Sequence, residues 1–156
     1  MNKKLFIVII ISLIWVYKCF NNRVDESAVK IEKLLDVAQS FEGVNYRAGG
    51  TTKRGMDCSG LVSTSFKSID VKLPRSSASM STVGTKVSLK KIQKGDLLFF
   101  NIDRLKGKIN HVGLVTSTDN EIIFIHSTTS KGVIYSSMKE NYWKNSFVIA
   151  KRIITH

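Results

Sequence analysis

Cys58, His111 and His126 are the residues of this sequence whose side-chain chemistry best fits catalysis. Cys58 stands at the predicted start of a helix, between an aspartate and a Ser-Gly pair. The positive end of a helix and a nearby imidazolium both favour the thiolate, which is the nucleophilic form of cysteine. A cysteine, a histidine and a third residue that orients the histidine form a constellation typical of hydrolases. We therefore expect Cys58 to be a nucleophile.

Two other interpretations of these residues remain open. A lone cysteine is often buried and inert, but the neighbours Asp57, Ser59 and Gly60 are polar or small, which argues against an apolar core position. Cys58, His111 and His126 could also be three ligands of a zinc ion. The sequence has no short paired ligand motif, so we predict no metal and no cofactor.

The first 19 residues differ in composition from the rest of the chain. Lys3 and Lys4 precede an apolar run that extends from Leu5 to Tyr17 and is interrupted only by Ser12. This pattern is typical of a secretory signal, and the run is short for a membrane-spanning helix, which needs roughly 20 residues. We expect residues 1–19 to be a signal peptide or a membrane or lipid anchor, and the polar residues 20–26 to be a tether.

Cys19 could carry a lipid as the first residue of a mature lipoprotein. The residue before such a cysteine is usually small, whereas Lys18 stands there in this sequence. Lipidation of Cys19, ordinary cleavage and an uncleaved anchor therefore all remain open. If Cys19 is removed or acylated, Cys58 has no partner for an intramolecular disulfide.

The chain of 156 residues is long enough for one domain with a hydrophobic core. Its formal net charge of +12 suits an anionic partner such as a wall polymer or a lipid surface. The basic residues are scattered and not interleaved with aromatic residues, and export also argues against nucleic acid as a partner. We expect the N-terminal segment to contact a membrane. We also expect the protein to be a monomer.

The order of the predicted elements indicates an α+β fold. Apolar residues recur at helical spacing between Ile31 and Phe41, and a second helix is predicted to begin at Cys58. Residues 76–80 are expected to add one helical turn. About five strands follow in the second half, and Asp96 is assigned a structural role in the turn before the first of them. Helices followed by strands imply an antiparallel sheet with the nucleophile helix packed on it.

Six segments in order resemble the NlpC/P60 family of bacterial cell-wall cysteine peptidases. The resemblance covers most of the chain, from about Leu34 to Arg152. The segments that carry it are Tyr46 with Gly49-Gly50, Asp57-Cys58-Ser59-Gly60-Leu61-Val62, Leu73-Pro74-Arg75, Gly95-Asp96-Leu97-Leu98-Phe99-Phe100, His111-Val112-Gly113 and Phe124-Ile125-His126-Ser127. The resemblance implies a papain-like fold for residues 27–156, with N-terminal helices packed on the sheet.

The resemblance also implies an activity and a role for each matched residue. It implies hydrolysis of amide bonds in peptidoglycan stem peptides, at the bond between D-glutamate and a diamino acid or at the cross-link. Cys58 matches the nucleophile, His111 the base, His126 the third polar residue and Tyr46 a tyrosine that supports the oxyanion. Three further positions match residues that contact the substrate: Asp57, Ser59 and Arg75.

The sequence departs from the family pattern in two places. Met80 stands where many members carry glutamine, and residues 102–110 form a basic insertion that we expect at the rim of the site. A related cysteine amidase and a non-catalytic wall-binding protein of the same fold remain alternatives to the endopeptidase. In each case the resemblance implies export to the bacterial cell envelope.

Overall fold

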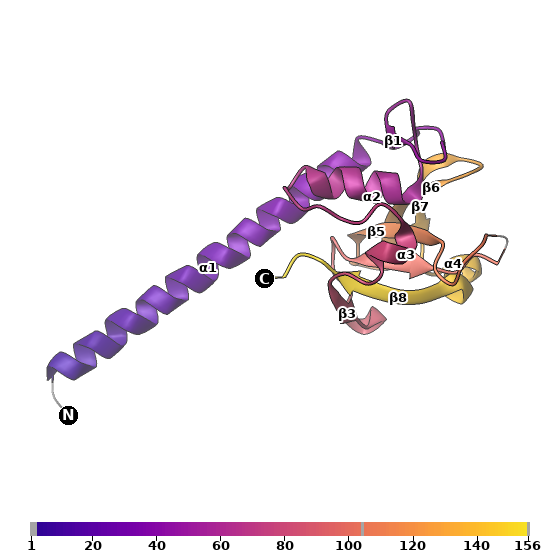
Figure 1. Ribbon diagram of the computed structural model, residues 1–156. Coiled ribbons are helices and arrows are strands. Elements are labelled where there is room, and N and C mark those ends of the chain that lie inside the picture. The colour runs from indigo at the N-terminus through magenta and orange to yellow at the C-terminus, as the bar shows by residue number, and fades with distance from the viewer. Residues whose placement is uncertain (1–2, 104, 156) are drawn as a thin grey trace.

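The computed structural model describes residues 3–103 and 105–155, and for part of the first helix it describes the backbone only. The first helix, α1 (Lys3–Gln39), is continuous, and its N-terminal half projects away from the rest of the molecule (Figure 1). Its C-terminal turns enter the core through Leu34 and Ala38, which are fully buried. The helical spacing of apolar residues between Ile31 and Phe41 therefore marks only the C-terminal part of a helix that begins at Lys3.

Residues 20–26, predicted to be a tether, are part of α1, so their role as a tether stays a prediction. The proposed lipid attachment falls on the side chain of Cys19, which lies outside the described residues. In the described part of the chain, no helix combines the length and the apolar character needed to cross a membrane.

Five short elements follow α1, and the last of them is the first strand of the main sheet. A glycine-rich turn leads into a small hairpin, and two helices and one edge strand follow. In chain order they are β1 (Thr51–Thr52), β2 (Gly55–Met56), α2 (Cys58–Lys67), α3 (Ser77–Met80) and β3 (Thr85–Val87). The Ser76 hydroxyl accepts a hydrogen bond from the Ser79 amide and so caps α3, which confirms the helical turn predicted for residues 76–80.

The second half of the chain supplies the rest of the sheet and two short helices. These elements are η1 (Leu89–Lys91), β4 (Leu97–Phe100), β5 (His111–Ser117), β6 (Ile123–Thr128), β7 (Gly132–Ser137), α4 (Asn141–Ser146) and β8 (Phe147–Arg152). The main sheet has the order β3-β8-β4-β5-β6-β7, and every neighbouring pair is antiparallel. The predicted α+β, papain-like class is confirmed.

Two details of the predicted elements were wrong. The sheet has six strands where about five were predicted, because β3 is a short, largely exposed edge strand that has no apolar run to reveal it. Helix α4 was also missed; it has six residues, too few to show a helical period.

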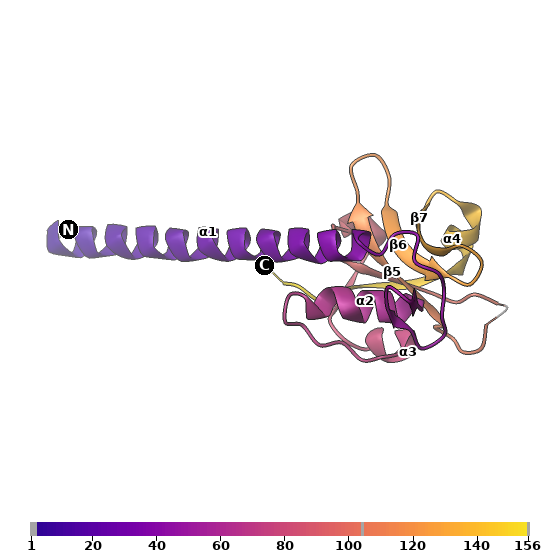
Figure 2. The ribbon, with the colours of Figure 1, turned by 90° about the horizontal axis from the view of Figure 1, so that it is seen from above.

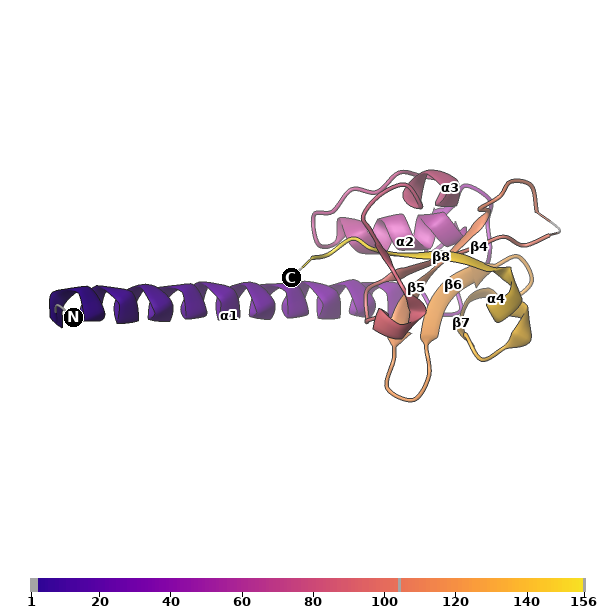
Figure 3. The same ribbon diagram turned by 90° about the horizontal axis from the view of Figure 1, so that it is seen from below.

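Hydrophobic side chains pack on both faces of the sheet. Leu97 and Phe99 of β4 face the helices, whereas Leu98 and Phe100 face α4, as the alternation of a strand requires. Helices α1 and α2 lie side by side over the first face (Figure 2). Helix α4 lies on the other side (Figure 3). The first turn of α2 and the first residue of β5 meet at one edge of this arrangement, where Cys58 and His111 are placed.

Candidate active site

Cys58 is the first residue of α2, and Asp57 caps that helix. The Gly60 amide donates to Asp57 Oδ1 over 2.6 Å, which satisfies one of the amide groups left open at a helix start. A Cβ at position 60 would lie 2.0 Å from the carbonyl oxygen of Gly50. Only glycine therefore fits there, and the close approach fixes the start of α2 against the preceding loop.

His111 and His126 are joined by a direct hydrogen bond. His111 begins β5, His126 lies in the adjacent β6, and His111 Nε2 is 2.9 Å from His126 Nδ1. His126 Nε2 is in turn 2.9 Å from the Ser136 hydroxyl of β7. Both imidazoles are buried. The hydrogen bond to His126 therefore holds the His111 ring in one orientation.

Trp143 of α4 packs against both imidazoles. Its indole stacks on His111 with 5.5 Å between ring centroids, and it meets His126 edge-on at 4.5 Å. A stacked indole restricts the rotation of the His111 ring and, through its electron-rich face, favours an imidazolium. Trp143 is not among the site residues predicted from the sequence. An aromatic residue just before the last strand gives no local sign that it reaches the histidines.

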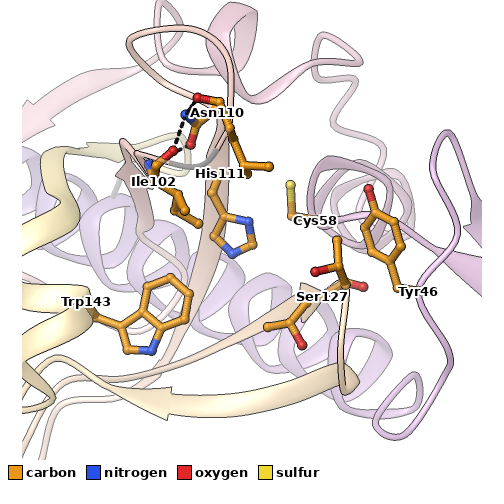
Figure 4. Close-up of a pocket in the computed structure, with 10 residues that line it drawn as sticks. Tyr46, Cys58, Ile102, Asn110, His111, Ser127 and Trp143 are labelled. Carbon is orange, nitrogen blue, oxygen red and sulfur yellow. Dashed lines mark hydrogen bonds between the residues drawn. The ribbon is translucent and has the colours of Figure 1, made fainter.

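One pocket contains the sulfur and the imidazole together. Cys58 and His111 lie beside each other in Figure 4, and Tyr46 lies on the far side of Cys58. The pocket has a volume of about 410 Å³, part of it open to solvent. Its remaining walls are Ile102, Leu105, Asn110, Ser127, Thr128, Thr129 and Trp143. The predicted nucleophile, base and oxyanion tyrosine thus share one cleft, and His126 stands behind His111.

The pKa of the Cys58 thiol is shifted in the opposite direction to the one expected from the sequence. Burial raises the pKa of the Cys58 thiol, and the charge of Asp57 adds to this; the amide of Val112 and the first amides of α2 oppose it without reversing it. From the sequence we expect a thiolate, favoured by the helix N-terminus and by a nearby imidazolium. The raised pKa favours the protonated thiol over the thiolate in the free protein.

Burial, together with the neighbouring His111, lowers the pKa of His126 to about 2. His126 is consequently neutral at any physiological pH and can orient His111 without repelling its charged form. Both ring nitrogens of His126 also take part in hydrogen bonds, which leaves no nitrogen for zinc. Among the described residues, no group of three or more histidine, cysteine or acidic side chains is arranged to hold a metal ion.

The three predicted substrate-binding residues form a cluster beside the pocket. Arg75 donates to both carboxylate oxygens of Asp57, over 2.9 and 2.7 Å, and to the Ser59 hydroxyl over 2.7 Å. The Gly49 amide donates to the second Asp57 oxygen. Ser59 is buried, whereas Arg75 is partly exposed and is the member of the cluster best placed to meet a ligand.

The basic insertion is organised by one side chain. Asn110 Oδ1 accepts from the Ile102 amide, and Asn110 Nδ2 donates to the carbonyl oxygens of Ile102, Leu105 and Gly107. These bonds fold the segment into a compact loop and place Leu105 in the pocket wall. The loop therefore lies at the rim of the site, as expected; Arg104 lies outside the described residues.

Comparison with known proteins agrees with this fold and this cleft. Residues 43–152 match the NlpC/P60 family. The chain is 40% identical to the probable endopeptidase NlpC of Escherichia coli, over 85% of this chain and 84% of that protein. It is 38% identical to the murein DD-endopeptidase MepS/murein LD-carboxypeptidase of the same organism, over 87% of this chain and 69% of that protein.

A crystal structure of an NlpC/P60 family protein from Bacillus cereus superposes with a TM-score of 0.72 at 30% identity. The superposition covers 80% of this chain and 40% of that one. A papain-like domain with a cysteine and a histidine in one cleft defines the class of cysteine peptidases. Within that class, the chain belongs to the NlpC/P60 family.

Proposed function

We propose that this protein hydrolyses amide bonds in the peptide part of peptidoglycan, with Cys58 as nucleophile and His111 as base. The observation that carries the proposal is the single pocket that contains both side chains, together with the 2.9 Å bond between His111 and His126. The similarity to a relative named as a murein endopeptidase supports the substrate class.

The proposed reaction has two halves. His111 accepts the thiol proton as Cys58 Sγ attacks the scissile carbonyl carbon. The C–N bond then breaks as His111 gives that proton to the leaving amine, and a thioester remains on Cys58. A water molecule, deprotonated by His111, attacks the thioester carbon. The acid product leaves, and the sulfur regains a proton.

The negative oxygen of each tetrahedral intermediate needs hydrogen-bond donors. The Cys58 amide at the start of α2 and the Tyr46 hydroxyl, which lines the same pocket, are the candidate donors. One such donor typically lowers the barrier by about 3 kcal/mol. In the free protein, burial raises the pKa of Tyr46, with smaller contributions from the Asp57 and Cys58 charges, so its hydroxyl keeps the proton that it must donate.

Asp57, Ser59 and Arg75 contact the polar ends of the stem peptide in this proposal. Because the Asp57 carboxylate is already bound by Arg75 and by two amides, Asp57 acts chiefly by holding Arg75 and the helix start in place. Arg75 keeps exposed surface with which it can meet a substrate carboxylate. The bond cut is the one after D-glutamate or the one at the cross-link.

We also propose that the protein acts at the bacterial cell envelope, attached through residues 1–19. The apolar start of α1 projects away from the catalytic domain, which suits an anchor that leaves the cleft open. Membrane fractionation of the full chain, compared with a variant lacking residues 1–19, tests the attachment. Recovery of both proteins in the soluble fraction would contradict it.

Mass spectrometry of defined muropeptides tests the activity and the bond together. If an uncross-linked stem peptide is split into two fragments after D-glutamate, the enzyme cuts the bond between D-glutamate and the diamino acid. If a cross-linked dimer yields two monomers, the enzyme cuts the cross-link. Cys58→Ala should abolish either product, whereas Lys67→Ala, at the exposed far end of the same helix, should leave both rates unchanged. Products that persist with Cys58→Ala would show that this cleft is not the catalytic site.

A further inference from the structure

A hydrogen-bonded chain runs from the proposed base across three adjacent strands. It passes from His111 in β5 to His126 in β6 and ends at Ser136 in β7, with both bonds 2.9 Å long. Ser136 pairs with Phe124, two residues before His126, so Ser136 and His126 are diagonal neighbours on one face of the sheet. All three polar side chains are buried.

This chain has two possible polarities, because a neutral imidazole has one N–H group. In the first, His126 donates from Nε2 to the Ser136 oxygen and accepts at Nδ1 from His111 Nε2–H. In the second, Ser136 donates to His126 Nε2, and His126 Nδ1–H donates to His111 Nε2. The second polarity places the proton of neutral His111 on Nδ1.

Only the first polarity is compatible with His111 as the base. His111 Nε2 faces His126, so Nδ1 is the ring nitrogen that must accept the thiol proton. Once His111 is an imidazolium, both of its nitrogens carry protons, and His126 Nδ1 must be an acceptor. His126 must then hold its own proton on Nε2, inside the protein, where an unpaired N–H group is costly.

We propose that Ser136 is a positioning residue that accepts the Nε2 proton of His126 and thereby fixes His111 in the tautomer that can act on Cys58. This inference rests on the proposed function, since it assigns Ser136 a part in the same reaction. With alanine at position 136, the Nε2–H tautomer of His126 loses its only hydrogen-bond acceptor among the residues that the structure describes. The tautomer with the proton on Nδ1 then becomes competitive.

The experiment reads the tautomer directly. The sequence has three histidines, so ¹H–¹⁵N correlation spectra of the imidazoles are simple to assign. We expect His126 to be a single Nε2–H tautomer in the wild-type protein. Ser136→Ala should give a mixture or the Nδ1–H form and lower kcat roughly ten- to a hundred-fold with little change in KM. Ser136→Thr, which keeps the hydroxyl, should retain the wild-type tautomer and most of kcat.

Ser137→Ala is the matched control, because its hydroxyl contacts Glu121 and not the histidines. It should leave the tautomer and kcat unchanged. A wild-type His126 with its proton on Nδ1 overturns the proposal, even if Ser136→Ala does not fold. A lower kcat in Ser136→Ala with an unchanged tautomer also overturns it, since that result shows a structural role only.

Failure of the proposed function gives a different result. If no muropeptide is cleaved by the wild-type protein, the rate of Cys58 alkylation by iodoacetamide replaces kcat as the readout of base strength. A Ser136→Ala variant with the altered tautomer and slower alkylation supports the role of Ser136 whatever the natural substrate is. An unchanged alkylation rate overturns that role.

Discussion

Two arginine–aspartate pairs with nearly the same hydrogen-bond lengths stand in different surroundings. Arg75 binds both oxygens of Asp57 over 2.9 and 2.7 Å, and Arg152 binds both oxygens of Asp96 over 2.8 Å. The Asp96 side chain is only 1% exposed and that of Arg152 21%. At the site, the Asp57 side chain is 16% exposed and that of Arg75 45%.

The difference in exposure suits the Asp96–Arg152 pair to a structural role and the Asp57–Arg75 pair to the proposed contact with substrate. Asp96 accepts from the Gln93 amide and from Arg152, so it ties the turn before β4 to β8 deep inside the molecule. Asp57 ties the nucleophile helix to an arginine that solvent, and hence a substrate, can reach. A buried pair that loses one partner leaves an uncompensated charge, whereas a half-exposed pair is replaced in part by water. The hydrogen-bond lengths alone would not distinguish the two pairs.

Removal of Asp96 should have the largest effect on stability. Asp96→Ala leaves the Arg152 guanidinium and the Gln93 amide without their partner, and we expect a loss of about 3–5 kcal/mol in the free energy of unfolding. Urea denaturation measures this loss. Asp119→Ala, at an exposed carboxylate in a turn, is the control and should change stability by less than about 0.5 kcal/mol. A loss of that small size in Asp96→Ala would mean that the buried pair is not structural.

The next largest effect is the pH dependence of the free energy of unfolding that His126 causes, and neither arginine–aspartate pair shares it. The unfolded chain binds a proton at His126 near pH 6.5, but the folded protein does not until about pH 2, so acid favours the unfolded state. We expect this single group to remove about 2 kcal/mol of stability between pH 7.5 and pH 5. His126→Gln cannot bind that proton, so its stability should fall by about 2 kcal/mol less than that of the wild-type protein over the same range.

Asp57 does not contribute in that pH range. Burial pushes the pKa of Asp57 upward, but the hydrogen bonds and charge of Arg75 and the amides of Gly60 and Gly49 outweigh it, and the pKa lies below its ordinary value. The stability from this carboxylate is therefore present above about pH 4 and is lost as the pH falls further. Urea titrations of the wild-type protein and of His126→Gln at pH 7.5 and pH 5 measure the difference. If both proteins lose the same stability between these pH values, His126 is not a buried neutral group.

Short motifs located most of the candidate site, because several residues of the site are close to one another in the sequence. Asp57 and Gly60 flank Cys58 and build the helix start on their own, and His111 begins a strand whose apolar residues are easy to recognise. These local patterns were enough to predict a helix packed on an antiparallel sheet and to bring Cys58 and His111 together, whereas Tyr46 was expected only from the family resemblance. The roles of these residues in the reaction remain proposals.

The contacts that the sequence did not reveal join distant segments. Arg152 is 56 residues from Asp96, and Ser136 reaches His126 only through the register of β6 and β7. Trp143 reaches the histidines from a short helix. The pKa of Cys58 is raised because its thiol is buried, and a position at a helix start does not reveal that burial. Packing between elements decides each of these features.

The smallest change in stability should come from replacing Arg75 with lysine, and the same change at Arg152 should give the sharpest contrast between the pairs. Lysine keeps the charge but cannot bind both carboxylate oxygens at once. Arg75→Lys should lower the free energy of unfolding by less than about 1 kcal/mol, because the pair is half exposed and Asp57 still caps α2 through Gly60. It should nevertheless reduce kcat/KM for a stem peptide about tenfold, since a fixed guanidinium fork is lost where the substrate binds.

Arg152→Lys is the matched variant and should show the opposite pattern. It removes a donor from the buried Asp96 and from the Lys91 carbonyl, so stability should fall by more than in Arg75→Lys while kcat/KM of the folded protein stays the same. Urea titration and steady-state kinetics on one muropeptide measure both quantities. If Arg75→Lys keeps the wild-type kcat/KM, the Asp57–Arg75 pair only supports the helix start, and the two pairs differ in degree of burial and not in function.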